Sequence, residues 1–279
     1  MEFEGKISTY LPEKRLTLFE TSPPSANVLL FIGGLGDGFN AVPYLPTLYK
    51  HLKQVNFSLV QLLLSSSYLG YGISSLEKDV EEISEALNFL EKKGKQNVII
   101  LGHSTGCQDC IVLSKRVNSS ILKGLVLQGP VSDREYFLSN SEQLPEWVEQ
   151  AKSMIAEDKG SELMPRIVDN TPITAERYYS LYGIGGADDF FSSDLSLVQM
   201  RELFKNLQYP MILLHSRDDE CVPSYVDKQV VLNRIREACG SELVRETLVI
   251  DGDHCITQPK DQDMLAEIVI KYAIEFCKM

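Results

Sequence analysis

The residues Gly102-His103-Ser104-Thr105-Gly106 form a G-x-S-x-G motif, the pattern of a serine nucleophile held on a tight turn. A strand-like apolar segment, Asn97 to Leu101, precedes the motif, and a helical pattern over Gln108 to Arg116 follows it. Such a turn needs small residues two positions either side of the serine, and the helix behind it directs its positive end toward the hydroxyl. This context favours Ser104 as a nucleophile over a chance occurrence of the motif.

A serine nucleophile needs a base, and the sequence offers four histidines. His51 lies on an early helical segment, and His215 ends an apolar strand. His103 adjoins Ser104, and we expect its side chain to point away from the hydroxyl. His254 lies in a loop after the last predicted strand, and it alone leaves room for an acid between serine and histidine, the chain order of serine hydrolases with this turn. The sequence therefore predicts His254 as the base.

The acid is expected after the penultimate strand, where Asp218, Asp219 and Glu220 are consecutive. One carboxylate suffices to orient the imidazole, and the residues alone leave the choice open. Two backbone amides are expected to bind the oxyanion. One is Thr105, directly after the nucleophile, and the other lies in the glycine-rich loop of residues 33–38, where Leu35 is the candidate.

Two other motifs suggest different chemistry. The run from Gly36 to Ala41 fits G-x-G-x-x-A, a dinucleotide-binding pattern, but no acidic residue occurs between Asp37 and Glu77 to bind a ribose. Cys107 and Cys110 form a C-x-x-C pair inside the helix after Ser104, where buried thiols are the better interpretation. We therefore predict no cofactor and no metal.

The surrounding elements alternate between strand and helix patterns, which predicts an α/β fold with a mostly parallel sheet covered on both faces. A strong helix signal is the apolar stripe Leu76, Val80, Ile83, Leu87 and Leu90, with a capping box starting at Ser74. Two weak strands open the chain. The other predicted strands are 28–32, 57–64, 97–101, 121–127, 211–215 and 246–250, and the other helices are 44–53, 108–116, 146–157, 175–181, 225–237 and 263–277.

Residues 133–200 interrupt this alternation with helical pieces and no convincing strand. We predict a single domain, with residues 1–132 and 201–279 as the core and residues 133–200 as a helical lid insertion. The insertion holds 13 acidic and 5 basic residues, a net charge of −8. A solvated surface explains such a charge, and a lid that attracts cationic substrates is the functional hypothesis.

Composition narrows the class of protein. The 279 residues have a net charge of −12, which argues against binding to nucleic acid or anionic membranes. The first residues show no secretory signal pattern, and no apolar run reaches the ~20 residues of a membrane helix. The six cysteines then fit free thiols in a reducing, cytoplasmic setting. Nothing in the sequence predicts an oligomeric state.

The motifs together resemble the α/β-hydrolase superfamily over essentially the whole chain. In that superfamily the acid stands three residues before a Val-Pro pair, and here Val222-Pro223 implies Asp219, with Asp218 as the second choice. A narrower similarity lies in residues 33–38, 102–109 and 128–135. These three segments resemble a mostly fungal, largely uncharacterised hydrolase family that includes an esterase of the siderophore fusarinine C. Gly33 stands where many lipases carry histidine, which argues against a common lipase.

The sequence thus predicts a serine esterase with the triad Ser104, Asp219 and His254 and an acyl-enzyme intermediate. Its expected partner is a small-molecule ester, and the charge of the insertion alone motivates the hypothesis of cationic hydroxyornithine esters of the siderophore type. The alternative is a ligand-binding or scaffold protein on the same fold without turnover, because a fold does not determine function.

Overall fold

The computed structural model describes residues 2–279, in which eight strands form one sheet ordered β1-β2-β4-β3-β5-β6-β7-β8. The strands are β1 (Gly5–Leu11), β2 (Leu16–Thr21), β3 (Asn27–Ile32), β4 (Phe57–Leu62), β5 (Asn97–His103), β6 (Leu122–Gln128), β7 (Met211–Ser216) and β8 (Val244–Ile250). Strand β2 pairs antiparallel with both β1 and β4, and all other neighbours are parallel. The parallel strands are rich in Val, Ile and Leu because both of their faces are buried.

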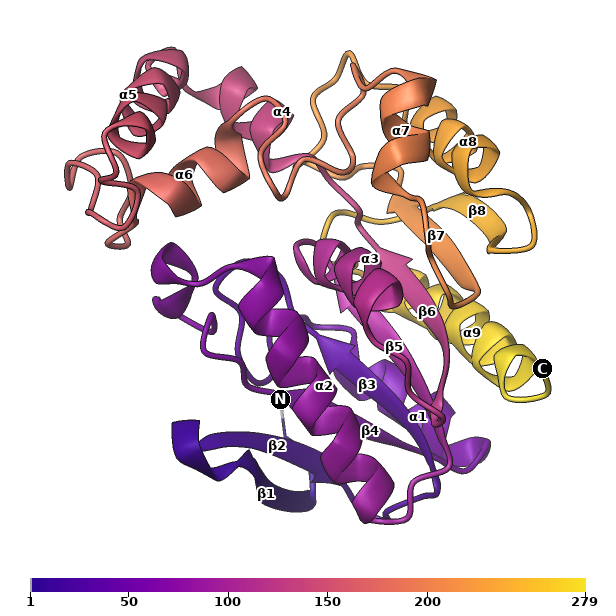
Figure 1. Ribbon diagram of the computed structural model, residues 1–279. Coiled ribbons are helices and arrows are strands. Elements are labelled where there is room, and N and C mark those ends of the chain that lie inside the picture. Colours follow the sequence, from indigo (N-terminus) through magenta and orange to yellow (C-terminus); the bar gives the residue numbers. More distant parts are fainter. Residues whose placement is uncertain (1) are drawn as a thin grey trace.

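Helices cover both faces of this sheet, as predicted (Figure 1). One face packs against α1 (Leu45–Gln54) and α9 (Pro259–Phe276), and the other against α2 (Leu76–Lys92), α3 (Gly106–Arg116) and α8 (Lys228–Cys239). The remaining helices are η1 (Pro12–Lys14), η2 (Gly70–Ile73), α4 (Asp133–Asn140), α5 (Leu144–Ala156), α6 (Ala175–Tyr182) and α7 (Leu197–Leu203). None of the helices in the described part of the chain has the length and apolar character to cross a membrane.

The predicted apolar stripe of α2 is buried along its whole length, but the predicted cap is wrong by one residue. Ser75, not Ser74, is the N-cap, and its hydroxyl accepts a hydrogen bond from the amide of Lys78. The Ser74 hydroxyl instead donates to Asp79 Oδ1 at 3.2 Å. A buried polar side chain needs a partner, and the Ser74 hydroxyl finds it in Asp79 and does not cap the helix.

Residues 133–200 form α4, α5, α6 and the start of α7, and within them the structure has a single isolated bridge between Leu163 and Thr174. Figure 1 shows α5 and α6 beside one another, outside the layers of the sheet. They share a small apolar core that includes Tyr178 and Leu181. Leu35 and Tyr71 from the sheet-bearing part pack against this core, so the segment meets the loops at the carboxyl edge of the sheet.

The parallel arrangement determines where a site can form. Strands β3, β5, β6, β7 and β8 all end at the same edge, because parallel strands present their carboxyl ends together. The loops that follow them contain residues 33–38, 104–105, 129–132, 217–223 and 251–258. Every residue in the predicted triad and oxyanion hole lies in one of these loops.

Candidate functional site

Ser104 occupies a sharp turn between β5 and α3 with φ of 53°, a left-handed conformation that serine rarely adopts. The flanking glycines make the turn possible. A Cβ atom on Gly102 would lie 2.3 Å from the carbonyl oxygen of Gly106, and one on Gly106 would lie 2.6 Å from that of Ile32. The local sequence therefore produces a strained turn that only small residues can flank, as the motif requires.

His254 and Asp219 form a buried hydrogen-bonded pair at the same sheet edge. The Nδ1 atom of His254 lies 3.0 Å from Oδ1 and 2.9 Å from Oδ2 of Asp219. Both residues are buried, whereas Asp218 is exposed. The structure thus brings His254 together with Asp219 and leaves Asp218 in solvent.

Three further contacts hold this pair in place. The backbone amide of Cys221 donates to Asp219 Oδ1 at 3.0 Å, and the amide of His254 donates to Glu220 Oε2 at 2.9 Å. The side-chain amide of Gln128 donates to the carbonyl of His254 at 3.0 Å. Gln128 is fully buried, and sequence reasoning missed it because nothing in the local pattern connects the end of β6 to a loop 126 residues away.

The charges of the pair shift both pKa values. Burial acts to raise the pKa of Asp219, but His215 and His254 outweigh it and hold that pKa below its usual value. Burial acts to lower the pKa of His254, but the hydrogen bond and charge of Asp219 outweigh it and raise that pKa. An ionised carboxylate beside an imidazole of raised pKa is the arrangement that stabilises an imidazolium.

The other histidines lie in the elements where the sequence placed them. His51 is on α1 and pairs with Asp263, and His215 is in β7. The ring of His103 packs against that of His254 with 4.9 Å between centroids. Its Nδ1 atom lies 2.6 Å from Gln128 Oε1, and burial lowers its pKa to about 3, so it stays neutral beside His254.

In the glycine-rich loop after β3, the amide of Leu35, the predicted oxyanion donor, has no acceptor within residues 2–279. The Gly34 amide donates to Asp37 Oδ2 at 2.7 Å, so it has an acceptor already. Among the described residues, the Leu35 and Thr105 amides have no hydrogen-bond acceptor. Asp37 was missed by sequence reasoning because a turn aspartate usually accepts from the amide two residues after it, whereas Asp37 accepts from the amide three residues before it.

Gly34 packs directly against the nucleophile: a Cβ atom there would lie 2.8 Å from Ser104 Cβ and 3.4 Å from its Oγ. This close approach brings the 33–38 loop beside the serine. The rival motif of this loop, Gly36 to Ala41, makes a turn around Asp37 and does not begin a helix, which a dinucleotide site requires. Cys107 and Cys110 are buried free thiols, as predicted.

The site also includes a group of potential metal ligands. Asp219, Cys221 and His254 have ligand atoms within 4.8 Å of one another. Two of these residues are already hydrogen-bonded to each other, and burial raises the pKa of the Cys221 thiol to about 12, so it is protonated. The arrangement is therefore that of a hydrogen-bonded acid–imidazole pair.

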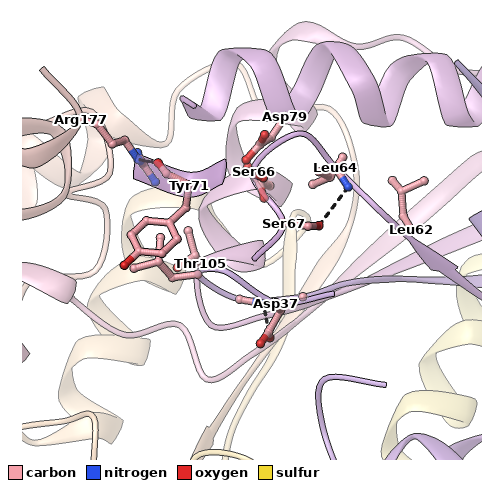
Figure 2. Close-up of a pocket in the computed structure, with 13 residues that line it drawn as sticks. Asp37, Leu62, Leu64, Ser66, Ser67, Tyr71, Asp79, Thr105 and Arg177 are labelled. Atoms are coloured by element: carbon pink, nitrogen blue, oxygen red, sulfur yellow. Dashed lines mark hydrogen bonds between the residues drawn. The ribbon is translucent and has the colours of Figure 1, made fainter. Parts of the chain in front are cut away.

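A small cavity of about 20 Å³ lies next to the predicted oxyanion amides (Figure 2). Gly34, Leu35 and Thr105 line one side of it. The remaining walls come from β4 and the loop after it and from η2, α2, α3 and α6, with Tyr71, Asp79, Asp109 and Arg177 among them. Arg177 thus brings the 133–200 segment into contact with the core at this point.

Comparison with known proteins identifies the family to which the chain belongs. A family model described as "Protein of unknown function (DUF1749)" matches residues 2–278. The UPF0613 protein PB24D3.06c of Schizosaccharomyces pombe is 36% identical over 240 residues, covering 78% of this chain and 76% of that protein. The fusarinine C esterase sidJ of Aspergillus fumigatus is 31% identical over 275 residues, covering 78% of each.

Among solved structures, the siderophore hydrolase EstB from Aspergillus fumigatus matches with a TM-score of 0.83 and 26% identity. The match covers 100% of this chain and 99% of that one. The fold is therefore the α/β-hydrolase fold, as the motifs indicated.

Proposed function

We propose that this chain, which belongs to the family described as "Protein of unknown function (DUF1749)", is a serine hydrolase of carboxylic esters. Relatives named as esterases support carboxylic ester hydrolysis. One observation carries the mechanism: Ser104 in a left-handed turn shares a sheet edge with the buried His254–Asp219 pair.

In the proposed reaction, Ser104 Oγ attacks the ester carbonyl while His254 Nε2 takes the hydroxyl proton. Asp219 holds the Nδ1 proton of His254 and stabilises the imidazolium. The amides of Leu35 and Thr105 donate to the oxyanion. When the intermediate collapses, the ester C–O bond breaks and His254 returns the proton to the leaving alcohol.

The resulting acyl-enzyme is then hydrolysed. Water attacks the acyl carbonyl while His254 takes one of its protons, and the second collapse frees the acid and restores the Ser104 hydroxyl. Neutral His103 packs against His254 throughout, so no second positive charge opposes the imidazolium.

For the substrate we propose small esters of the siderophore type, built from hydroxyornithine units with free amines. The names of two relatives, a fusarinine C esterase and a siderophore hydrolase, support this class. The Glu220 carboxylate, which interacts electrostatically with His254, supports a cationic substrate. The segment 133–200 would act as a lid, and the six free cysteines suit a reducing cytoplasm.

A fluorophosphonate probe tests the nucleophile. We expect labelling of the native protein and none of Ser104→Ala or His254→Ala, with kcat on a simple ester reduced about a million-fold in each. Ser153→Ala and His51→Ala, which change exposed or half-buried helix positions, are the matched controls and should label normally. Full esterase activity in Ser104→Ala would refute the mechanism, and ligand binding without labelling would indicate a non-catalytic protein.

A further inference from the structure

Gln128 is the last residue of β6, a strand that is paired on both sides, with β5 and with β7 (Figure 1). Its backbone is therefore held more firmly than that of a loop residue. The residue is 0% exposed. A buried amide is costly unless its polar atoms are hydrogen-bonded, so the partners of this side chain indicate what it does.

Gln128 forms hydrogen bonds with the backbones of both the proposed nucleophile and the proposed base. Its carbonyl oxygen accepts from the Ser104 amide at 3.0 Å. Its side-chain Nε2 atom donates to the His254 carbonyl at 3.0 Å, across 126 positions of sequence. The thiol of Cys107, in the helix behind Ser104, also donates to the Gln128 carbonyl at 3.3 Å. A single residue of the sheet thus connects the turn that holds Ser104 to the loop that holds His254.

The other end of the Gln128 amide determines which nitrogen of His103 carries the proton. A carbonyl can only accept, so the His254 carbonyl requires the amide nitrogen, and the amide oxygen must face the opposite partners. Gln128 Oε1 lies 3.1 Å from the Tyr44 hydroxyl and 2.6 Å from His103 Nδ1. Because this oxygen is only an acceptor, both partners must donate to it. The bonding pattern therefore assigns the His103 proton to Nδ1.

The same amide oxygen links Gln128 to the ring of His254. The His103 ring, fixed by its bond to Gln128, packs against His254 with centroids 4.9 Å apart and an angle of 47° between the planes. Tyr44 packs edge-on against His103 with 6.3 Å between centroids. Aromatic rings at such distances attract one another in preferred orientations. Gln128 therefore acts on His254 at two points, the backbone carbonyl directly and the imidazole through His103.

We propose that Gln128 is a positioning residue of the esterase, which sets the place of His254 relative to Ser104. It is buried and takes no part in the proton transfer. It acts by holding the backbones of both residues and, through His103, the orientation of the His254 ring. Displacing a reacting group by about 1 Å can cost about 10²-fold in rate, so the effect belongs in kcat. The inference rests on the proposed function, because it takes Ser104 as nucleophile and His254 as base.

Steady-state kinetics on a simple ester test this role, with kcat expressed per site that a fluorophosphonate labels at completion. Gln128→Met keeps the approximate size of the side chain and removes its hydrogen bonds. We expect kcat per labelled site to fall by about 10²-fold while KM stays near its native value. A side chain that only stabilises the fold would lower the number of labelled sites and leave kcat per site unchanged, and that result would overturn the proposal.

Gln262→Met is the matched control. Gln262 is also a buried glutamine, and its Nε2 atom donates to the carbonyls of Ile256 and Thr257, in the same loop as His254, at 3.1 and 3.2 Å. This variant should lose stability, measured as Tm, yet keep the native kcat per labelled site. An equal loss of kcat in Gln262→Met would contradict a specific role for Gln128. A native protein that is not labelled at Ser104 would instead refute the proposed function.

The tautomer of His103 gives a second test, which requires neither turnover nor a change at Gln128. Burial lowers the pKa of His103 to about 3, so its ring is neutral at neutral pH. NMR of Ser104→Ala protein with isotope-labelled histidine distinguishes the two tautomers, and the His103 signal is the one absent from His103→Phe. We expect the proton on Nδ1. A proton on Nε2 would mean that the Gln128 amide does not donate to His254, and it would overturn the proposal even if Gln128→Met does not fold.

Discussion

At the scale of single residues, the proposed role of His254 as general base predicts the pH range of activity. Because Asp219 raises the pKa of His254 above its usual value of about 6.5, the imidazole stays protonated to a higher pH than a free histidine. A protonated histidine cannot act as a general base. We therefore expect kcat/KM to fall as pH is lowered through a midpoint above the ordinary histidine value.

The Asp219→Asn substitution tests this electrostatic argument. Without the carboxylate, burial alone acts on His254, so the midpoint should move to lower pH while kcat drops by up to about 10⁴-fold. A pH–rate profile of both proteins measures the two effects together. Asp218→Asn is the matched control because that carboxyl is exposed. An unchanged midpoint in Asp219→Asn would show that another group controls the acidic limb.

Gly34 supports a second prediction at this scale. A Cβ atom there would lie 2.8 Å from Ser104 Cβ, too close for either residue to keep its position. We expect Gly34→Ala to lower kcat by at least about 10²-fold, because small displacements of a reacting group cost that much. Gly160→Ala is the control, since an added Cβ meets only ordinary contacts of 3.6 Å there. Near-normal kcat in Gly34→Ala would mean that the loop moves aside freely.

At the scale of elements, Arg177 joins the 133–200 segment to the core. The residue is on α6, yet it donates to the carbonyl of Tyr71 in η2 and faces Asp79 of α2 and Asp109 of α3. Its own partner, Asp188, lies in the same segment. The only described guanidinium in the cavity therefore links α6 to η2, α2 and α3, which all lie far from α6 in the chain.

Removing this charge should be strongly destabilising. Arg177→Met leaves Asp188 buried without its partner, and breaking one side of a buried ion pair typically costs about 3–5 kcal/mol. Urea unfolding measures the change in the free energy of unfolding. Arg166→Met, at an exposed position of the same segment, should change it by less than about 0.5 kcal/mol. A loss below about 1 kcal/mol for Arg177→Met would contradict a structural role for this pair.

At the scale of the whole molecule, the acidic charge is divided between surface and interior. Eight of the 13 acidic residues in segment 133–200 are exposed, and the other five are buried or half-buried. Several of the inner ones have named partners, such as Asp189 with Arg134 and Asp188 with Arg177. Part of the charge that the sequence suggested for substrate attraction therefore stabilises the segment itself.

The exposed part still predicts an effect of salt. A negative surface raises the encounter rate of cations, and salt screens the attraction. We expect kcat/KM for a cationic ester to fall with ionic strength, while that for a neutral ester of the same size stays constant. Replacing Glu146 and Glu149 of α5 by glutamine should weaken the salt dependence. Equal salt dependence for the two esters would leave the surface charge with a role in solubility only.

Much of the fold and site could be predicted because their signals are local. The G-x-S-x-G turn depends in part on the close approach of Gly102 to the Gly106 carbonyl, within five residues. The buried stripe of α2 depends on helical periodicity within one segment. His254 could be selected because the chain order of the triad excludes the other histidines. For the turn and the α2 stripe, the signal lies within a short stretch of chain. For His254, it lies in the order of residues along the chain.

Other features arise only when the parallel sheet aligns loops from distant parts of the chain. The burial of Asp219 beside His254, the packing of His103 on His254 and the hydrogen bond from Gln128 to the His254 carbonyl are of this kind. The Asp109 cavity is another, since its walls come from several helices and loops. Sequence by itself determined the order of elements and predicted Ser104 and His254 as nucleophile and base, because backbone sterics and periodicity act locally. Tertiary structure decided which side chains share a buried space, because burial and pairing exist only between segments brought together by folding.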